Sequence, residues 1–202
     1  MSIFQHFQSR YDEAQEECYS IQDFLSLCRN DPMTYASAAQ RLLKAIGQPE
    51  MIDTSNEPCL SRIFSNRVIA RYPAFKEFYG MEEAIEQIVA YLTHASQGLE
   101  EQKQILYLLG PVGGGKSSLA EKLKALIQQE PIYVLSANGE RSPVNDHPFC
   151  LFDAHTDGKI LQQEYNIPGR YLSTIMSPWI AKRLHEFKGD ISKFEVIKIY
   201  PS

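Results

Sequence analysis

The sequence predicts an α/β fold in which helices flank a parallel sheet, preceded by a small helical module. In the first third, apolar residues recur at helical spacing. Residues 105–109 then form a short, continuous apolar run, which is typical of a strand buried on both faces. A glycine-rich loop, an amphipathic helix and a second apolar run at 132–135 follow. Strand, loop, helix and strand in this order form a βαβ unit, and this predicts that the two strands run parallel.

Residues 1–75 are expected to form the helical module and a linker. Apolar side chains within residues 3–18 fall at helical spacing. Ser20 resembles the first residue of a capping box that opens a second helix, and Asp31, followed by proline, is typical of the start of a third. Prolines interrupt residues 48–75, so no long element is expected there.

Residues 76–202 are expected to form the N-terminal part of the α/β domain. Residues 81–92 carry an apolar stripe at helical spacing opposite a face rich in Glu and Gln. A further helix is predicted to begin at Ser177, and residues 194–200 alternate in the manner of a strand.

The loop between the predicted strand and helix carries the strongest chemical signal. Residues 110–117 read Gly-Pro-Val-Gly-Gly-Gly-Lys-Ser and fit the pattern G-x-x-x-x-G-K-[ST]. Glycines let backbone amides approach phosphate oxygens, and the following helix adds its free amides and positive dipole end. The lysine would neutralise the β- and γ-phosphates, and the serine hydroxyl would be a ligand of Mg²⁺.

The loop therefore predicts binding of ATP and Mg²⁺. The candidate nucleotide-binding residues in and beside the loop are Gly110, Pro111, Val112, Gly113, Gly114, Gly115, Lys116, Ser117 and Ser118, with Ser117 as the metal ligand. A dinucleotide-binding loop is the alternative for a glycine-rich turn. It is disfavoured because Ser136 and Ala137 stand where that fold needs an acidic residue at the end of the next strand.

Hydrolysis of ATP would need a second carboxylate, and Asp153 is the candidate. It follows the apolar residues 149–152, but Ala154 stands where a catalytic glutamate is expected. A core strand followed by a surface aspartate is the other interpretation, and it is favoured. The polar residues 136–147 follow the second predicted strand, so they fit either a substrate-binding segment or a surface loop.

A metal cluster is a further interpretation of the residues around Asp153. The spacing of His147, Cys150, Asp153 and His155 matches no zinc pattern, so structural roles are favoured.

Composition limits the partners. The 202 residues carry 20 Lys and Arg against 25 Asp and Glu, a formal charge of −5, which argues against nucleic acid as a partner. The longest apolar run is far below the roughly 20 residues that span a bilayer. Four cysteines without framework spacing and the lack of a secretory signal favour a cytoplasmic protein with no membrane partner.

Four stretches of the sequence resemble the bacterial PrkA family, which is named as serine protein kinases with an AAA-type ATPase domain. They are residues 62–73, 78–85, 110–118 and 142–148. The resemblance implies an AAA+ P-loop fold in which Tyr79 and Gly80 lie near the adenine. It also implies a longer protein, of which this chain would be an N-terminal fragment.

The resemblance implies an ATP-dependent serine protein kinase, although the motifs of eukaryotic-type protein kinases are absent from the sequence. The alternatives are an AAA+ ATPase that remodels or assembles proteins, and a regulatory nucleotide-binding module. The full-length protein could be a homo-oligomer. No catalytic residue, sensor or arginine finger is identified, so the chain alone is expected to hydrolyse ATP weakly or not at all.

Overall fold

A computed structural model describes residues 17–201 except 57, 100–102, 112 and 173–174. Contacts divide the described residues into two compact units. Unit 1 contains residues 17–35 and 131–200, and unit 2 contains residues 36–130 together with residue 201. This grouping differs from the domain boundary at residue 75 that the sequence predicts. That boundary stays a prediction.

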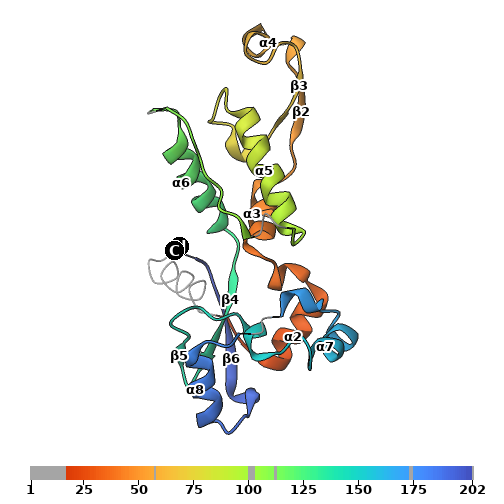
Figure 1. The fold of residues 1–202 in the computed structure, drawn as a ribbon, viewed down its shortest axis with the longest axis vertical. Coiled ribbons are helices and arrows are strands. Elements are labelled where there is room, and N and C mark those ends of the chain that lie inside the picture. The colour runs from red at the N-terminus through yellow and green to blue at the C-terminus, as the bar shows by residue number, and fades with distance from the viewer. Residues whose placement is uncertain (1–16, 57, 100–102, 112, 173–174, 202) are drawn as a thin grey trace, which may run out of the picture. The chain divides into compact units, whose positions relative to one another are not determined.

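Unit 1 contains a four-stranded sheet in the order β1-β6-β4-β5 (Figure 1). Its strands are β1 (Glu17–Ser20), β4 (Ile132–Ala137), β5 (Glu140–Arg141) and β6 (Phe194–Ile199). All neighbours pair antiparallel; Val134, for example, lies opposite Ile197.

The prediction of a parallel sheet is therefore wrong for the described residues, although strands at 132–135 and 194–200 are confirmed. The tail strand β6 pairs with β4 along its whole length, and the two-residue strand β5 pairs with the end of β4 on the other side. The first half of β6 alternates between buried and exposed residues, as antiparallel strands with one covered face do. Residues 105–109, the expected parallel partner, belong to unit 2.

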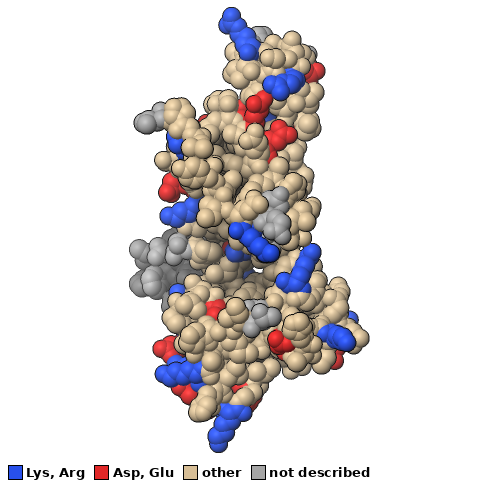
Figure 2. Space-filling model, in the orientation of Figure 1, with Lys and Arg blue, Asp and Glu red and all other residues tan. Residues whose placement is uncertain are grey.

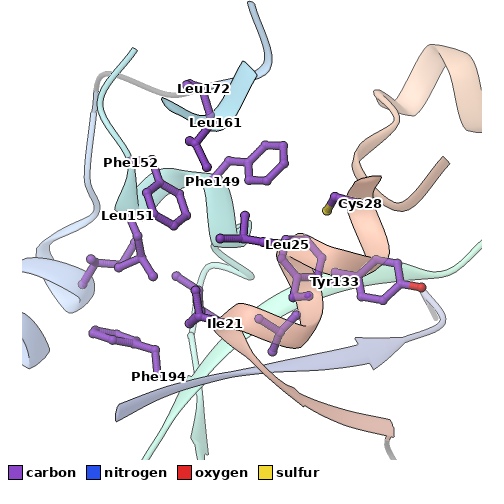
Figure 3. Close-up of a cluster of buried hydrophobic side chains, with 14 of the residues drawn as sticks. Ile21, Leu25, Cys28, Tyr133, Phe149, Leu151, Phe152, Leu161, Leu172 and Phe194 are labelled. Atoms are coloured by element: carbon purple, nitrogen blue, oxygen red, sulfur yellow. The ribbon is translucent and has the colours of Figure 1, made fainter. Parts of the chain in front are cut away.

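Helices and short 3₁₀ turns accompany the sheet of unit 1, and four of them matter most for its core. They are α2 (Ile21–Asn30), η5 (Pro148–Leu151), α7 (Gly158–Tyr165) and α8 (Pro178–Glu186). Side chains of α2 and of residues 149–152 face one another in the core (Figure 3). Phe24, Phe149 and Phe194 are almost completely buried there. Ser20 caps α2 by accepting a hydrogen bond from the backbone N–H of Asp23, as predicted.

Unit 2 combines helices with a two-stranded antiparallel ribbon. Its elements are α3 (Ala38–Ile46), β2 (Glu50–Asp53), α4 (Pro58–Phe64), β3 (Val68–Arg71), α5 (Glu82–Ser96) and α6 (Lys116–Ile127). The strands β2 and β3 form the ribbon, and α3 packs against α5 and α6. The core joins Ile46, Ile85, Ile88 and Leu119. The predicted helices at 81–92 and after the glycine loop are thus confirmed as α5 and α6.

The helix predicted to begin at Asp31 is interrupted. Pro32–Tyr35 forms a 3₁₀ turn, η1, and α3 begins only after Ser37. The Ser37 side chain accepts from the Gln40 backbone N–H, and the Gln40 side chain accepts from the Ser37 backbone N–H. This capping box provides a helix start that the sequence reading missed. The predicted helix at 3–18 falls mainly outside the described residues, and Cys18 lies in β1.

Residues 105–109 form no strand, so this prediction is wrong for the described structure. The segment has no regular secondary structure, and Ile105, Tyr107 and Leu109 are 91%, 77% and 82% exposed. Leu106 is less exposed, at 38%, and Leu108 packs against the core of unit 2. None of these five residues hydrogen-bonds through its backbone to another described backbone group. The segment is extended and alternates like a strand, but it has no strand beside it among the described residues.

Candidate functional site

The glycine-rich loop opens α6 through two left-handed glycines. Gly113 has φ +80°, and Gly115, the N-cap of α6, has φ +72°. The backbone N–H of Gly114 donates to the carbonyl of Pro111 at 3.2 Å. A Cβ at Gly114 would lie 3.1 Å from that carbonyl oxygen. The loop conformation therefore requires glycine. At Gly113 and Gly115 other residues rarely adopt the positive φ, and at Gly114 a side chain would crowd the loop backbone.

The Lys116 side chain folds back over the loop. Its Nζ donates to the carbonyl oxygen of Gly110 at 2.8 Å and also to that of Pro111. Ser117 and Ser118, in the first turn of α6, are exposed. The loop thus gathers an ammonium group, two hydroxyls and the free amides of a helix N-terminus, a donor set suited to an anion. Val112 lies outside the described residues.

A broad pocket of about 920 Å³ opens on one side of the loop. It is lined by Glu77, Phe78, Tyr79, Met81, Gly113, Gly114, Gly115, Ser117, Ser118, Glu121 and Lys122. Tyr79 is 76% exposed, and the guanidinium of Arg71 lies 5.8 Å from the centre of its ring. Gly80 follows with φ +77°, which turns the chain toward α5. The structure thus brings Tyr79 and the loop, both predicted site residues, to one pocket.

Gly110, Pro111 and Lys116 border a second hollow, of about 400 Å³. Apolar side chains of α5 and of residues 106–109 form most of its wall. It lies beside the extended segment that precedes the loop.

The sequence reading missed the pocket residues Glu77, Phe78, Met81, Glu121 and Lys122. Glu121 and Lys122 lie three and four positions after Ser118, so they occupy the same helix face. That spacing was a usable signal. The carboxylate of Glu77 forms a 2.9 Å ion pair with Lys122, a contact between segments far apart in sequence that no local pattern reveals.

Asp153, the candidate second carboxylate, has a local role in the structure. Its Oδ1 accepts hydrogen bonds from the backbone N–H groups of His155 and Thr156, in the turn before α7. The amides of Thr156 and His155 lower the pKa of this carboxyl. Asp153 belongs to unit 1 and the loop to unit 2.

The other polar candidates also lie in unit 1. The carboxylate of Asp146 accepts from the hydroxyls of Ser142 at 2.7 Å and Ser177 at 2.6 Å, which ties the 142–146 turn to the start of α8. His147 accepts from the backbone N–H of Phe149 through Nδ1. Among the described residues, no group of three or more His, Cys, Asp or Glu side chains is placed to hold a metal ion.

Comparison with known proteins decides the family. The PrkA AAA domain matches residues 19–202. The chain belongs to this family. The match covers most of the chain and includes the glycine loop, so a P-loop NTPase domain is the fold class that the family implies.

Two relatives carry different names. The chain is 71% identical over its full 202 residues to the serine/threonine kinase YeaG of Escherichia coli strain K12, of which it covers 31%. It is 30% identical over 186 residues to the ATP-dependent protease PrkA of Bacillus subtilis strain 168, covering 88% of the chain and 26% of that protein. The chain thus spans about a third of these relatives or less. No solved structure matches it.

Surface charge and helix length concern the expectations about nucleic-acid and membrane partners. On the face drawn in Figure 2, Lys and Arg side chains are interspersed with Asp and Glu side chains. In the described part of the PrkA-family chain, no helix has the length and apolar character needed to cross a bilayer.

Proposed function

We propose that this PrkA-family chain binds Mg²⁺–ATP at residues 110–118. The observation that carries the proposal is the loop geometry. Two left-handed glycines turn the backbone toward the start of α6, and the Lys116 ammonium lies across the same concave turn. Carbonyl oxygens now accept the protons of this ammonium, so phosphate oxygens, which bear a full negative charge, would compete well for it.

The residues present fit both ATP and Mg²⁺. Lys116 would hold the β- and γ-phosphates, and the loop amides would contact phosphate oxygens. A Cβ at Gly114 would crowd the carbonyl of Pro111 and so disturb the loop that presents these amides. The exposed hydroxyl of Ser117 is available as a ligand of Mg²⁺. When bound, the ion would neutralise charge on the phosphates.

Tyr79 and Gly80 are proposed to hold the adenine. The Tyr79 ring is exposed within the same pocket, and a flat aromatic surface offers stacking to a purine. The guanidinium of Arg71 lies near that ring. Gly80 would contribute the chain turn that presents the ring.

For the whole protein we propose ATP-dependent phosphoryl transfer to protein serine, which is the activity that the resemblance to PrkA-type kinases implies. The name of the Escherichia coli relative supports it. The name of the Bacillus subtilis relative favours a second candidate, an AAA+ ATPase that acts on proteins without phosphorylating them. Labelling a protein serine from γ-labelled ATP by the full-length protein would support the kinase. Release of free phosphate alone would support the ATPase. A cytoplasmic protein that forms homo-oligomers fits either one.

Calorimetry with Mg²⁺–ATP tests the binding proposal. We expect Lys116→Ala to weaken binding by about 10- to 100-fold, because charged hydrogen bonds to phosphate are worth roughly 1.5–3 kcal/mol. Lys124→Ala removes an exposed lysine from the last turn of the same helix and is the matched control, with unchanged affinity expected. Equal affinity of Lys116→Ala and the parent chain would refute the proposal.

A further inference from the structure

Met81 lies between the proposed adenine side and the phosphate loop. It is the residue before α5, two positions after Tyr79, and its partly buried side chain packs against the core of unit 2. It lines both the 920 Å³ pocket and the 400 Å³ hollow. Met81 thus borders both of the spaces that the loop residues line.

Met81 approaches the loop at Gly115. A Cβ built on Gly115 would lie 3.0 Å from the Met81 sulfur and 3.7 Å from its terminal methyl. Gly115 has a left-handed backbone, and α6 begins immediately after it. The thioether therefore fills the space beside the residue at which the loop turns into the helix.

The segment from Glu77 to Met81 is attached to α6 at both of its ends. At the first end is the Glu77–Lys122 ion pair, whose side chains are 54% and 29% exposed. Because solvent screens exposed charges, such a pair contributes little to the stability of this attachment. At the second end is the packing of Met81 against Gly115. The apolar contact between Met81 and Gly115 is not weakened by solvent screening.

We propose that Met81 is a positioning residue for the phosphate loop, holding Gly115 in the conformation that presents the loop amides to a triphosphate. The inference rests on the proposed binding of Mg²⁺–ATP and adds a residue to that site. Methionine suits the role, because its unbranched, polarisable side chain fills irregular spaces. Alanine would leave the loop without this support, whereas leucine would restore most of the volume.

The test measures which part of the nucleotide loses affinity. Mg²⁺–ATP, Mg²⁺–tripolyphosphate and adenosine each compete with a fluorescent ATP analogue on Met81→Ala, Met81→Leu and the parent chain. Met51→Ala is the matched control, because Met51 is 66% exposed on β2 of the same unit. We expect Met81→Ala to weaken ATP and tripolyphosphate equally, by about five- to tenfold, with adenosine unchanged, and leucine to restore affinity to within about twofold.

A double substitution tests the contact itself. Gly115→Ala should weaken ATP binding both through backbone strain and by crowding the Met81 sulfur. Combining it with Met81→Ala removes the crowding, so the double variant should bind tighter than the product of the two single losses predicts. If Met81→Ala does not fold, Met81→Val, which shortens the side chain less, takes its place with the same expectation.

The outcomes separate the two proposals. Loss of affinity in Lys116→Ala together with unchanged triphosphate binding in Met81→Ala would overturn the role of Met81 alone. A loss confined to adenosine would overturn it as well, since Met81 would then contact the base. Strictly multiplicative losses in the double variant would do the same. Equal binding by Lys116→Ala and the parent chain would refute the binding proposal instead.

Discussion

Two leucines ten residues apart in unit 2 have opposite environments, so one substitution at both positions tests the structure. Leu119, in the first turn of α6, is 2% exposed and belongs to the same core cluster as Ile85 and Ile88. Leu109, just before the phosphate loop, is 82% exposed. Replacing buried leucine by alanine costs the transfer free energy of the lost atoms plus that of the cavity, so Leu119→Ala should destabilise unit 2 by about 2–4 kcal/mol. Leu109→Ala should cost less than about 0.5 kcal/mol.

Hydrogen exchange measured by mass spectrometry is the assay, read on peptides from α5 and α6. The single tryptophan, Trp179, lies in unit 1, so its fluorescence would follow the wrong part of the chain. In Leu119→Ala, amides that exchange only when unit 2 opens should exchange about 30- to 1,000-fold faster, the factor that corresponds to the expected free energy. In Leu109→Ala they should exchange at the parent rate.

A similar acceleration in both variants would refute the reasoning. It would mean that Leu109 is buried, as the sequence alone predicts for a strand covered on both faces. A parent rate in Leu119→Ala would contradict the assignment of Leu119 to the core.

Two further predictions concern ionisable side chains of known environment. Burial raises the pKa of the Cys28 thiol to about 12, so Cys28 should resist a thiol reagent near neutral pH until the chain unfolds. The exposed Cys18 and Cys59 and the half-buried Cys150 are replaced by serine, which leaves Cys28 as the one thiol, and prompt labelling of this triple variant would contradict the prediction. Backbone N–H groups of Thr156 and His155 lower the pKa of Asp153 below its ordinary 3.8, so its contribution to stability is present above that value and is lost as the pH falls through the lowered pKa. Asp153→Asn should therefore show a shallower loss of urea resistance on acidification below about pH 4, and an acid limb identical to that of the parent chain would count against the role of the carboxylate.

Local patterns predicted the elements of the candidate site well. The loop at 110–117, the helix after it and the helix at 81–92 follow from glycine placement and apolar periodicity, which act over a few residues. The capping role of Ser20 follows from the same kind of signal. Pairing in space was predicted poorly. That β4 would pair with a strand about 60 residues later, and antiparallel, depends on contacts that no short window contains.

The residues of the candidate site also fall into those that a local pattern reveals and those that only the folded structure reveals. Lys116 and Ser117 are visible in the sequence, because their chemistry and spacing define the motif. Met81 and the Glu77–Lys122 pair were not, since their importance comes from which segments fold against the loop. Asp153 fits a catalytic carboxylate by residue type alone, but its oxygens serve a local turn.

The extended residues 105–109 also affect how this chain behaves in solution. The most exposed apolar side chains of this segment share one face, and its peptide groups hydrogen-bond to no other backbone group among the described residues. Such a segment is the kind of edge through which proteins associate. Copies of the 202-residue chain would then adhere at high concentration by adding strand to strand, without any specific assembly being involved. Apparent stoichiometry and cooperativity in nucleotide binding should for this reason be measured over a range of protein concentrations. A variant with a charged residue in place of Tyr107 is the reference, because the charge would keep copies of the chain from pairing along this segment.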